Sequence, residues 1–116
     1  MKVLHLLAAG ILIGVVAAFA PARAPSRLFL VGDSTVMTYK NSDAPMTGWG
    51  QRIGWFFAEG TVTVINRAIG GRSSRSFIEE GRWNTVRDEL VAGDFLFIQF
   101  GHNDRSTVAE RHADTA

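Results

Sequence analysis

Short apolar runs alternate with amphipathic segments along most of the 116-residue chain. Three runs predict β-strands: RLFLV at residues 27–31, the β-branched TVTVIN at 61–66 and FLFIQF at 95–100. The third run is almost wholly apolar, which predicts a strand that is covered on both faces.

Between these strands, two segments carry apolar residues at the period of an α-helix. The first stripe consists of Trp49, Ile53, Phe56 and Phe57, and the second of Trp83, Val86, Leu90 and Val91. Gly60 and Gly93 are expected to end the two helices. The stripe favours a core position for Trp49 over a role as a platform for a sugar. Strands alternating with helices predict an α/β fold with a parallel sheet and right-handed crossovers.

The N-terminal segment differs from the rest of the chain. Lys2 precedes a run that is apolar from residue 3 to residue 20 except for His5, and small residues and prolines follow. This pattern predicts a cleaved signal peptide over residues 1–24, a domain over 25–116 and a secreted or periplasmic protein without stable membrane association. An uncleaved membrane anchor is the alternative, because about 18 apolar residues are the lower limit for a span.

Composition narrows the chemistry. The chain has no cysteine, which excludes disulfides, a cysteine nucleophile, a lipid-anchored N-terminus and thiolate metal sites. The formal net charge is +1 and the basic residues are scattered, so no nucleic-acid partner is expected. We see no ligand set for a metal ion and expect no cofactor.

Each predicted strand runs into a small polar cluster at its carboxyl end: GDST, then RAIGGRSSR, then GHND. Ligands of open parallel sheets bind beyond these strand ends, so the three loops are expected to converge on one edge. Ser34, beside a glycine just past a strand, could be a nucleophile if a base activates it. The structural alternative is that Asp33 or Ser34 only caps the following turn.

The second and third clusters suggest groups that could bind an anion. Gly70 and Gly71 can turn the backbone with its amides exposed, which suits an oxyanion. A plain strand-to-helix connection and a phosphate site using Arg72 and Arg75 are the alternatives, although no nucleotide-binding glycine motif is present.

In the third cluster, GHND, the amide of Asn103 can donate to the same oxyanion. His102 could be catalytic, orienting or structural, and Asp104 could cap a turn.

The three clusters together resemble the SGNH (GDSL-type) hydrolase superfamily. The resemblance implies Ser34 as nucleophile, with Gly71 and Asn103 in the oxyanion hole together with the Ser34 amide. It also implies a three-layer α/β/α, flavodoxin-like parallel sheet of which these residues hold the first three strands. Asp33 would brace the nucleophile turn. The loop from Arg72 to Arg75 would shape the site.

Three longer segments are similar to one branch of this superfamily, the rhamnogalacturonan acetylesterases. They are GWGQ at 48–51, GGRSSRSFIEEGRW at 70–83 and GDFLFIQFGHND at 93–104. This resemblance implies a secreted serine esterase that removes acetyl groups from a pectin-type polysaccharide. Acetylated xylan and small acetylated sugars remain alternatives.

The D-x-x-H motif that supplies the general base in this family does not occur among the 116 residues. His112 is the nearest substitute, but the residue three before it is Ala109. Serine is a weak nucleophile without a base, so the chain is expected to be an N-terminal fragment that is inactive by itself. Two alternatives are a non-catalytic carbohydrate-binding relic and a flavodoxin-like anion or nucleotide binder that uses Gly70, Gly71 and Arg72.

Overall fold

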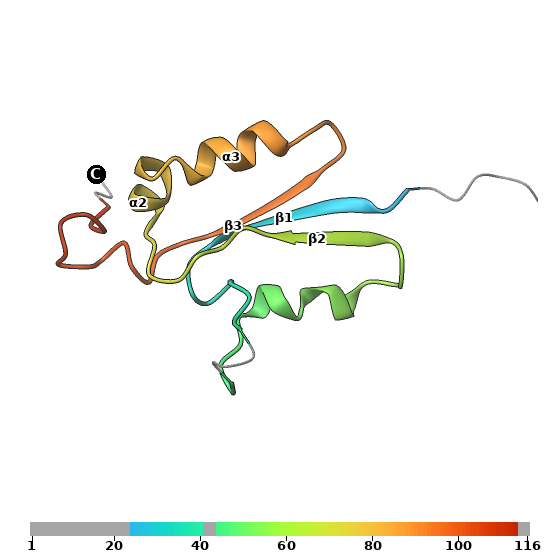
Figure 1. Ribbon diagram of the computed structural model, residues 1–116, viewed down its shortest axis with the longest axis horizontal. Helices are drawn as coiled ribbons and strands as arrows, with labels where there is room; N and C mark the ends of the chain where they lie inside the picture. Colours follow the sequence, from blue (N-terminus) through green and yellow to red (C-terminus); the bar gives the residue numbers. More distant parts are fainter. Residues whose placement is uncertain (1–23, 41–43, 114–116) are drawn as a thin grey trace, which may run out of the picture.

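Three parallel strands form one sheet in the computed structural model, which describes residues 24–40 and 44–113. The strands are β1 (Ser26–Gly32), β2 (Val62–Asn66) and β3 (Phe95–Gln99), arranged in the order β2-β1-β3 (Figure 1). The predicted signal peptide falls almost entirely in residues 1–23, outside the described residues. The α/β class, the three strands and their parallel pairing are confirmed.

The sheet is covered by short 3-10 helices on one face and by α-helices on the other (Figure 1). The 3-10 helices are η2 (Trp49–Gln51) and η3 (Ile53–Phe56), and the α-helices are α2 (Ser74–Glu79) and α3 (Arg82–Glu89). Side chains alternate along a strand, so β1 supplies a core to each face. Leu28 and Leu30 face the η side, whereas Phe29 and Val31 pack with Phe77 and other residues of the α side.

The prediction of a single helix over residues 49–57 is wrong. The chain forms two short 3-10 helices there, separated at Arg52. Trp49 and Ile53 pack against the core as their spacing suggests, but Phe56 is 84% exposed. The glycines of GWGQ explain the difference, since a Cβ at Gly50 would lie 2.3 Å from the carbonyl oxygen of Val36. This backbone contact holds the segment against the preceding loop.

Three further differences concern the α2 to β3 region. A short helix, α2, follows the second strand without having been predicted, and Ser73 begins it with a capping box formed with Ser76. The predicted helical stripe before Gly93 runs two residues too far, because α3 ends at Glu89; Leu90 still packs against the core, but Val91 is 63% exposed. β3 is not covered on both faces as predicted, since Phe95 is 56% exposed.

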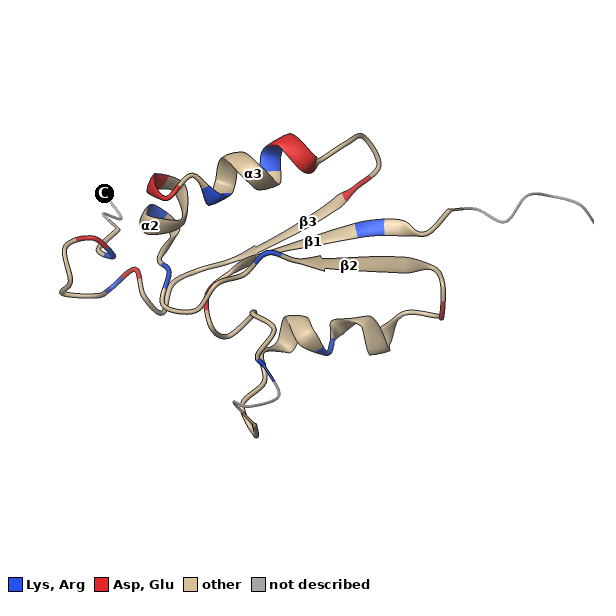
Figure 2. Cartoon of the chain, viewed as in Figure 1, with Lys and Arg blue, Asp and Glu red and all other residues tan. Residues whose placement is uncertain are grey.

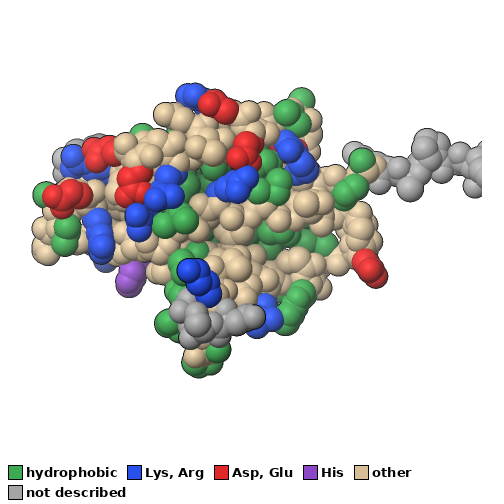
Figure 3. Space-filling model, viewed as in Figure 1, with side chains coloured by type: hydrophobic (Ala, Val, Ile, Leu, Met, Phe, Trp, Pro, Cys, Tyr) green, Lys and Arg blue, Asp and Glu red, His purple; other side chains and the backbone are tan. Residues whose placement is uncertain are grey.

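Charged residues lie mainly on α2, α3 and the loop after β3, while the strands carry few (Figure 2). The space-filling view shows both signs intermixed over that part of the surface (Figure 3). Within residues 24–40 and 44–113, no helix has the length and apolar character needed to cross a membrane.

Candidate active site

A tight turn directly after β1 carries Ser34. The side chain of Asp33 is buried and its Oδ1 accepts hydrogen bonds from the backbone N–H of Thr35 at 2.9 Å and from the Thr35 hydroxyl at 2.8 Å. The backbone carbonyl of Asp33 accepts from the N–H groups of Val36 and Met37, both at 3.1 Å. Asp33 therefore closes the turn, a contact that both the bracing role implied by the resemblance and the structural alternative of a turn cap predict.

Ser34 itself remains available to a ligand. Its hydroxyl makes no hydrogen bond to any described residue, and it lines a hollow of about 490 Å³ together with Tyr39, Met46 and Trp49. Trp49 thus packs on the core, as predicted, and also forms part of the wall beside the serine.

The loop after β2 approaches the serine through its glycines. A Cβ built on Gly70 would lie 3.6 Å from the Cβ of Ser34, so Gly70 lies next to the serine side chain. Gly71 has φ +75°, a conformation that glycine adopts at low cost. The backbone N–H groups of Ser34 and Gly71 donate to no described residue, so both can bind an incoming oxygen atom.

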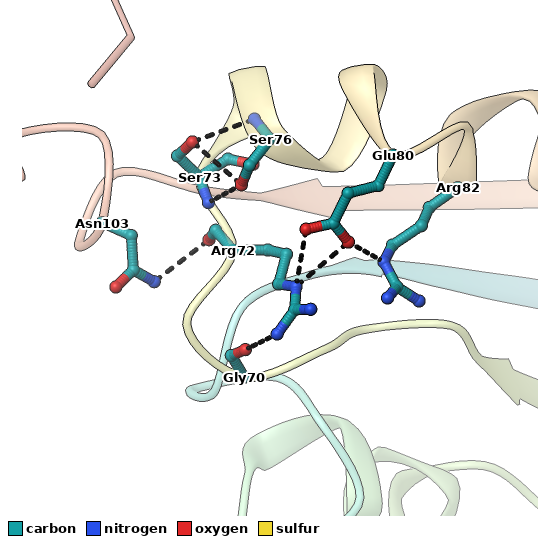
Figure 4. A network of polar contacts seen from close by, with 7 residues as sticks. All are labelled: Gly70, Arg72, Ser73, Ser76, Glu80, Arg82 and Asn103. Atoms are coloured by element: carbon teal, nitrogen blue, oxygen red, sulfur yellow. Dashed lines mark hydrogen bonds and ion pairs between the residues drawn. The ribbon is translucent and has the colours of Figure 1, made fainter. Parts of the chain in front are cut away.

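Asn103 is tied to this same loop. Its Nδ2 donates to the backbone carbonyl of Arg72 at 3.0 Å, which joins the loop after β3 to the loop after β2 (Figure 4). The amide group carries a second N–H that has no partner within the described residues. Ser34, Gly71 and Asn103 are therefore gathered around one loop, at the carboxyl end of the sheet.

Arg72 acts as an internal clamp in this arrangement. Its guanidinium donates to the carbonyl of Gly70 at 3.0 Å and pairs with Glu80 of the α2–α3 connection (Figure 4). The hydrogen bond from Arg82, assisted by Arg72, lowers the pKa of Glu80 from its ordinary value. The charge of Arg72 is thereby matched inside the protein, which argues against the phosphate-binding alternative.

The other predicted residues have different surroundings. Asp104 accepts from the N–H of Ser74 at 2.7 Å and from its hydroxyl at 3.1 Å, so it caps α2 rather than its own turn. His102 is exposed and makes no hydrogen bond to a described residue. The exposed His112 lies on a loop that Arg75 holds against α2 through the carbonyl of His112 at 3.3 Å. His5 lies outside the described residues.

Sequence reasoning missed three residues that support the turn: Thr35, Gln99 and, in its hydrogen-bonding role, Trp49. Gln99 is the one polar residue of β3, whose sequence is FLFIQ. Its place at the end of an otherwise apolar strand, two residues before the GHND cluster, is the signal that could have found it. No group of three acidic or histidine side chains suited to a metal occurs within the described part of the chain.

A serine on a braced turn, next to unpaired backbone amides, is an arrangement suited to hydrolysis through an acyl-enzyme. The model of the GDSL-like Lipase/Acylhydrolase family matches residues 28–115. The chain belongs to this family.

Several relatives align with this chain. It is 52% identical over 81 residues to the rhamnogalacturonan acetylesterase RhgT of Bacillus subtilis, an alignment that covers 70% of this chain and 34% of RhgT. It is 39% identical over 96 residues to a rhamnogalacturonan acetylesterase of Emericella nidulans, covering 82% of this chain and 35% of that protein. The chain thus spans about a third of the length of these relatives.

A solved structure supports the same fold. The crystal structure of the protein YxiM from Bacillus subtilis superposes with a TM-score of 0.64 at 30% identity, over 71% of this chain and 23% of YxiM. YxiM is described as an uncharacterized esterase.

Proposed function

We propose that residues 25–116 carry the nucleophile and the oxyanion hole of a secreted serine esterase that removes acetyl groups from a pectin-type, rhamnogalacturonan polysaccharide. The hydroxyl oxygen of Ser34 attacks the acetyl carbonyl carbon, and collapse of the tetrahedral intermediate breaks the ester C–O bond. The sugar hydroxyl leaves with the proton that the serine loses, and acetyl-Ser34 remains as the acyl-enzyme. The amides of Ser34 and Gly71 and the side chain of Asn103 stabilise the oxyanion. Water then releases acetate, with no metal ion or cofactor required.

One observation carries this proposal. The serine with a free hydroxyl, two unpaired backbone amides and the Asn103 amide are linked through the single loop of residues 70–72. A free hydroxyl beside a loop that carries unpaired N–H donors suits the attack on a carbonyl and the stabilisation of the negative charge that develops. The choice of rhamnogalacturonan is supported by the names of two relatives, and secretion by the composition of residues 1–24.

The 116 residues alone are proposed to turn over esters very slowly. Neither His102 nor His112 has the D-x-x-H context of the family's base. Without a base the serine hydroxyl stays protonated and weakly nucleophilic. The isolated chain should therefore hydrolyse p-nitrophenyl acetate no faster than its own Ser34→Ala variant, and clear serine-dependent turnover would contradict this.

A chimera tests the enzymatic proposal itself. Residues 24–113 of this chain replace the matching segment of RhgT, which supplies the remaining two thirds of an esterase. The chimera is expected to release acetate from acetylated rhamnogalacturonan faster than from acetylated xylan, and Ser34→Ala should abolish both activities. A folded chimera that binds the polysaccharide but releases no acetate would instead support the non-catalytic relic.

A further inference from the structure

Three hydrogen bonds in series connect η2, the end of β3 and the nucleophile turn. The indole Nε1 of Trp49 donates to Oε1 of Gln99 at 2.7 Å. The Nε2 of Gln99 donates to the Thr35 hydroxyl at 2.7 Å, and that hydroxyl donates to Oδ1 of Asp33 at 2.8 Å. The series thus ends on the side chain that closes the turn under Ser34.

The chemistry of the four groups fixes the direction of the series. An indole N–H can only donate, so the oxygen of the Gln99 amide must face Trp49 and its NH₂ group must face Thr35. The Thr35 hydroxyl then accepts from Gln99, and its own hydrogen is free to go to Asp33. Each of the three bonds joins a donor to an acceptor, and no other orientation of the Gln99 amide would satisfy both ends.

Gln99 is well placed to hold this position. It pairs with Gly32 in the parallel register of β1 and β3, one residue before Asp33. Alternation along β3 sends its side chain to the same face as Phe97 and Phe95, on the side of the sheet where η2 lies (Figure 1). The strand register therefore sets how far the amide reaches toward the turn.

We propose that Gln99 is a positioning residue for the proposed esterase site: through Thr35 and Asp33 it fixes the orientation of the Ser34 turn, and Trp49 fixes Gln99. This inference rests on the proposed function only for its consequence in catalysis. Trp49, Thr35 and Ser34 all line the same hollow, so the series also holds the aromatic wall at a set distance from the serine.

The structural part is tested on the isotope-labelled 116-residue chain by nuclear magnetic resonance. Gln99→Met removes both amide hydrogen bonds while keeping an unbranched side chain. It is expected to shift the indole resonance of Trp49 and the backbone amide resonance of Thr35 together, with the indoles of Trp55 and Trp83 as internal references. A shift at Trp49 with the Thr35 amide unchanged would overturn the proposal.

Gln51→Met is the matched control. Gln51 also accepts two hydrogen bonds near η2, from the N–H of Tyr39 and the hydroxyl of Thr47, both at 3.2 Å, but it does not touch the series. It should leave the Thr35 amide and the Trp49 indole in place. Equal shifts from Gln51→Met and Gln99→Met would show a general loosening and contradict a specific role.

The functional part is tested in the chimera with RhgT. Thr35→Val removes the hydroxyl that joins Gln99 to Asp33, and Thr35→Ser keeps it. Because Thr35 is exposed, these two variants test the positioning role even if Gln99→Met does not fold. We expect Gln99→Met and Thr35→Val to lower kcat by about 10- to 100-fold with little change in KM, because a misplaced nucleophile costs rate more than binding. Thr35→Ser should retain most of the activity.

Failure of the proposed function and failure of the positioning role give different results. A parent chimera without serine-dependent turnover would defeat the proposed function, while the resonance shifts would still decide whether the series holds the turn. An active chimera in which Thr35→Val and Thr35→Ser have equal kcat would defeat the positioning role alone.

Discussion

β1 and β3 have similar apolar sequences but very different surroundings. In β1, Phe29 and Leu30 are fully buried, each in the core of a different face. In β3, Phe97 is 48% and Ile98 57% exposed, and of the described strands only β1 pairs with it. Apolarity alone therefore did not determine burial. Burial depends instead on the central place of β1, which has a neighbouring strand on each side and helices on both faces.

Both strands nevertheless end in groups of the candidate site. Ser34 follows the buried strand and Asn103 follows the exposed one. The turn after β1 is fixed by Asp33 and by the hydrogen bonds that reach it from Gln99, whereas the loop after β3 is docked through Asn103 and Asp104. The comparison predicts that the buried side chains of β1 determine stability, whereas substitutions at the end of β3 affect rate more than stability.

The largest expected effect is the loss of a core side chain from β1. Phe29→Ala leaves a cavity between the sheet and the α-helices and should lower the free energy of unfolding by about 3–5 kcal/mol. Phe97→Ala should cost about half as much or less, because its side chain is half exposed and leaves no enclosed cavity. Urea denaturation of the two variants measures the difference, and equal losses would break the comparison.

The next effect concerns rate at the end of β3. Asn103→Ala in the chimera with RhgT should lower kcat by about 10²–10³-fold, as removal of one oxyanion-hole donor typically does. Asn103→Asp, which keeps the size but loses the N–H donors, should be similarly slow. Initial rates of acetate release measure this, and near-parental kcat in either variant would leave Asn103 as a docking residue only.

A pH-dependent effect is expected where the two strands begin. The hydrogen bond from Arg27 of β1, and then that from the N–H of Val91, lower the pKa of Asp94, which precedes β3. A lowered pKa in the folded state stabilises the protein above the ordinary carboxyl value, and this contribution disappears as the pH falls through the folded-state value. Asp94→Asn should therefore be less stable than the parent near neutral pH.

The same pair of proteins provides its own control. Urea midpoints of Asp94→Asn and the parent should converge as the solution is acidified below the ordinary carboxyl value. A gap that stays constant down to strongly acidic pH would show that the ion pair with Arg27 is not its cause.

The smallest effect on stability is expected at the exposed face of β3. Phe95→Lys places a charge on a strand whose apolar side chains are open to solvent, and such charges oppose edge-to-edge association. Sedimentation should show less self-association than in the parent, with the urea midpoint nearly unchanged. Leu30→Lys, at a fully buried position of β1, should instead prevent folding.

The sequence was sufficient for the parts of the fold that depend on local pattern. The three strands and their parallel order followed from short apolar runs between helical segments. The positions of Ser34, Gly71 and Asn103 at strand ends followed from the same reading, and the structure brings all three to the loop of residues 70–72. Their catalytic roles remain predictions.

The parts that were missed depend on contacts between distant segments. The 3-10 geometry after Trp49 arises because Gly50 lies against the backbone of Val36. The spacing of apolar residues does not predict that contact. Asp104 caps α2, thirty residues earlier in the chain, rather than a neighbouring turn. The role of Gln99 depends on the register between β1 and β3, which periodicity does not provide.

The most direct test of the central claim is to find which serine reacts. The chimera with RhgT is treated with a fluorophosphonate, digested and examined by mass spectrometry. We expect one adduct from this segment, on Ser34, which is absent from the Ser34→Ala variant, while Ser73 and Ser74 at the start of α2 stay unmodified. An active chimera whose labelling and turnover persist in Ser34→Ala would contradict it.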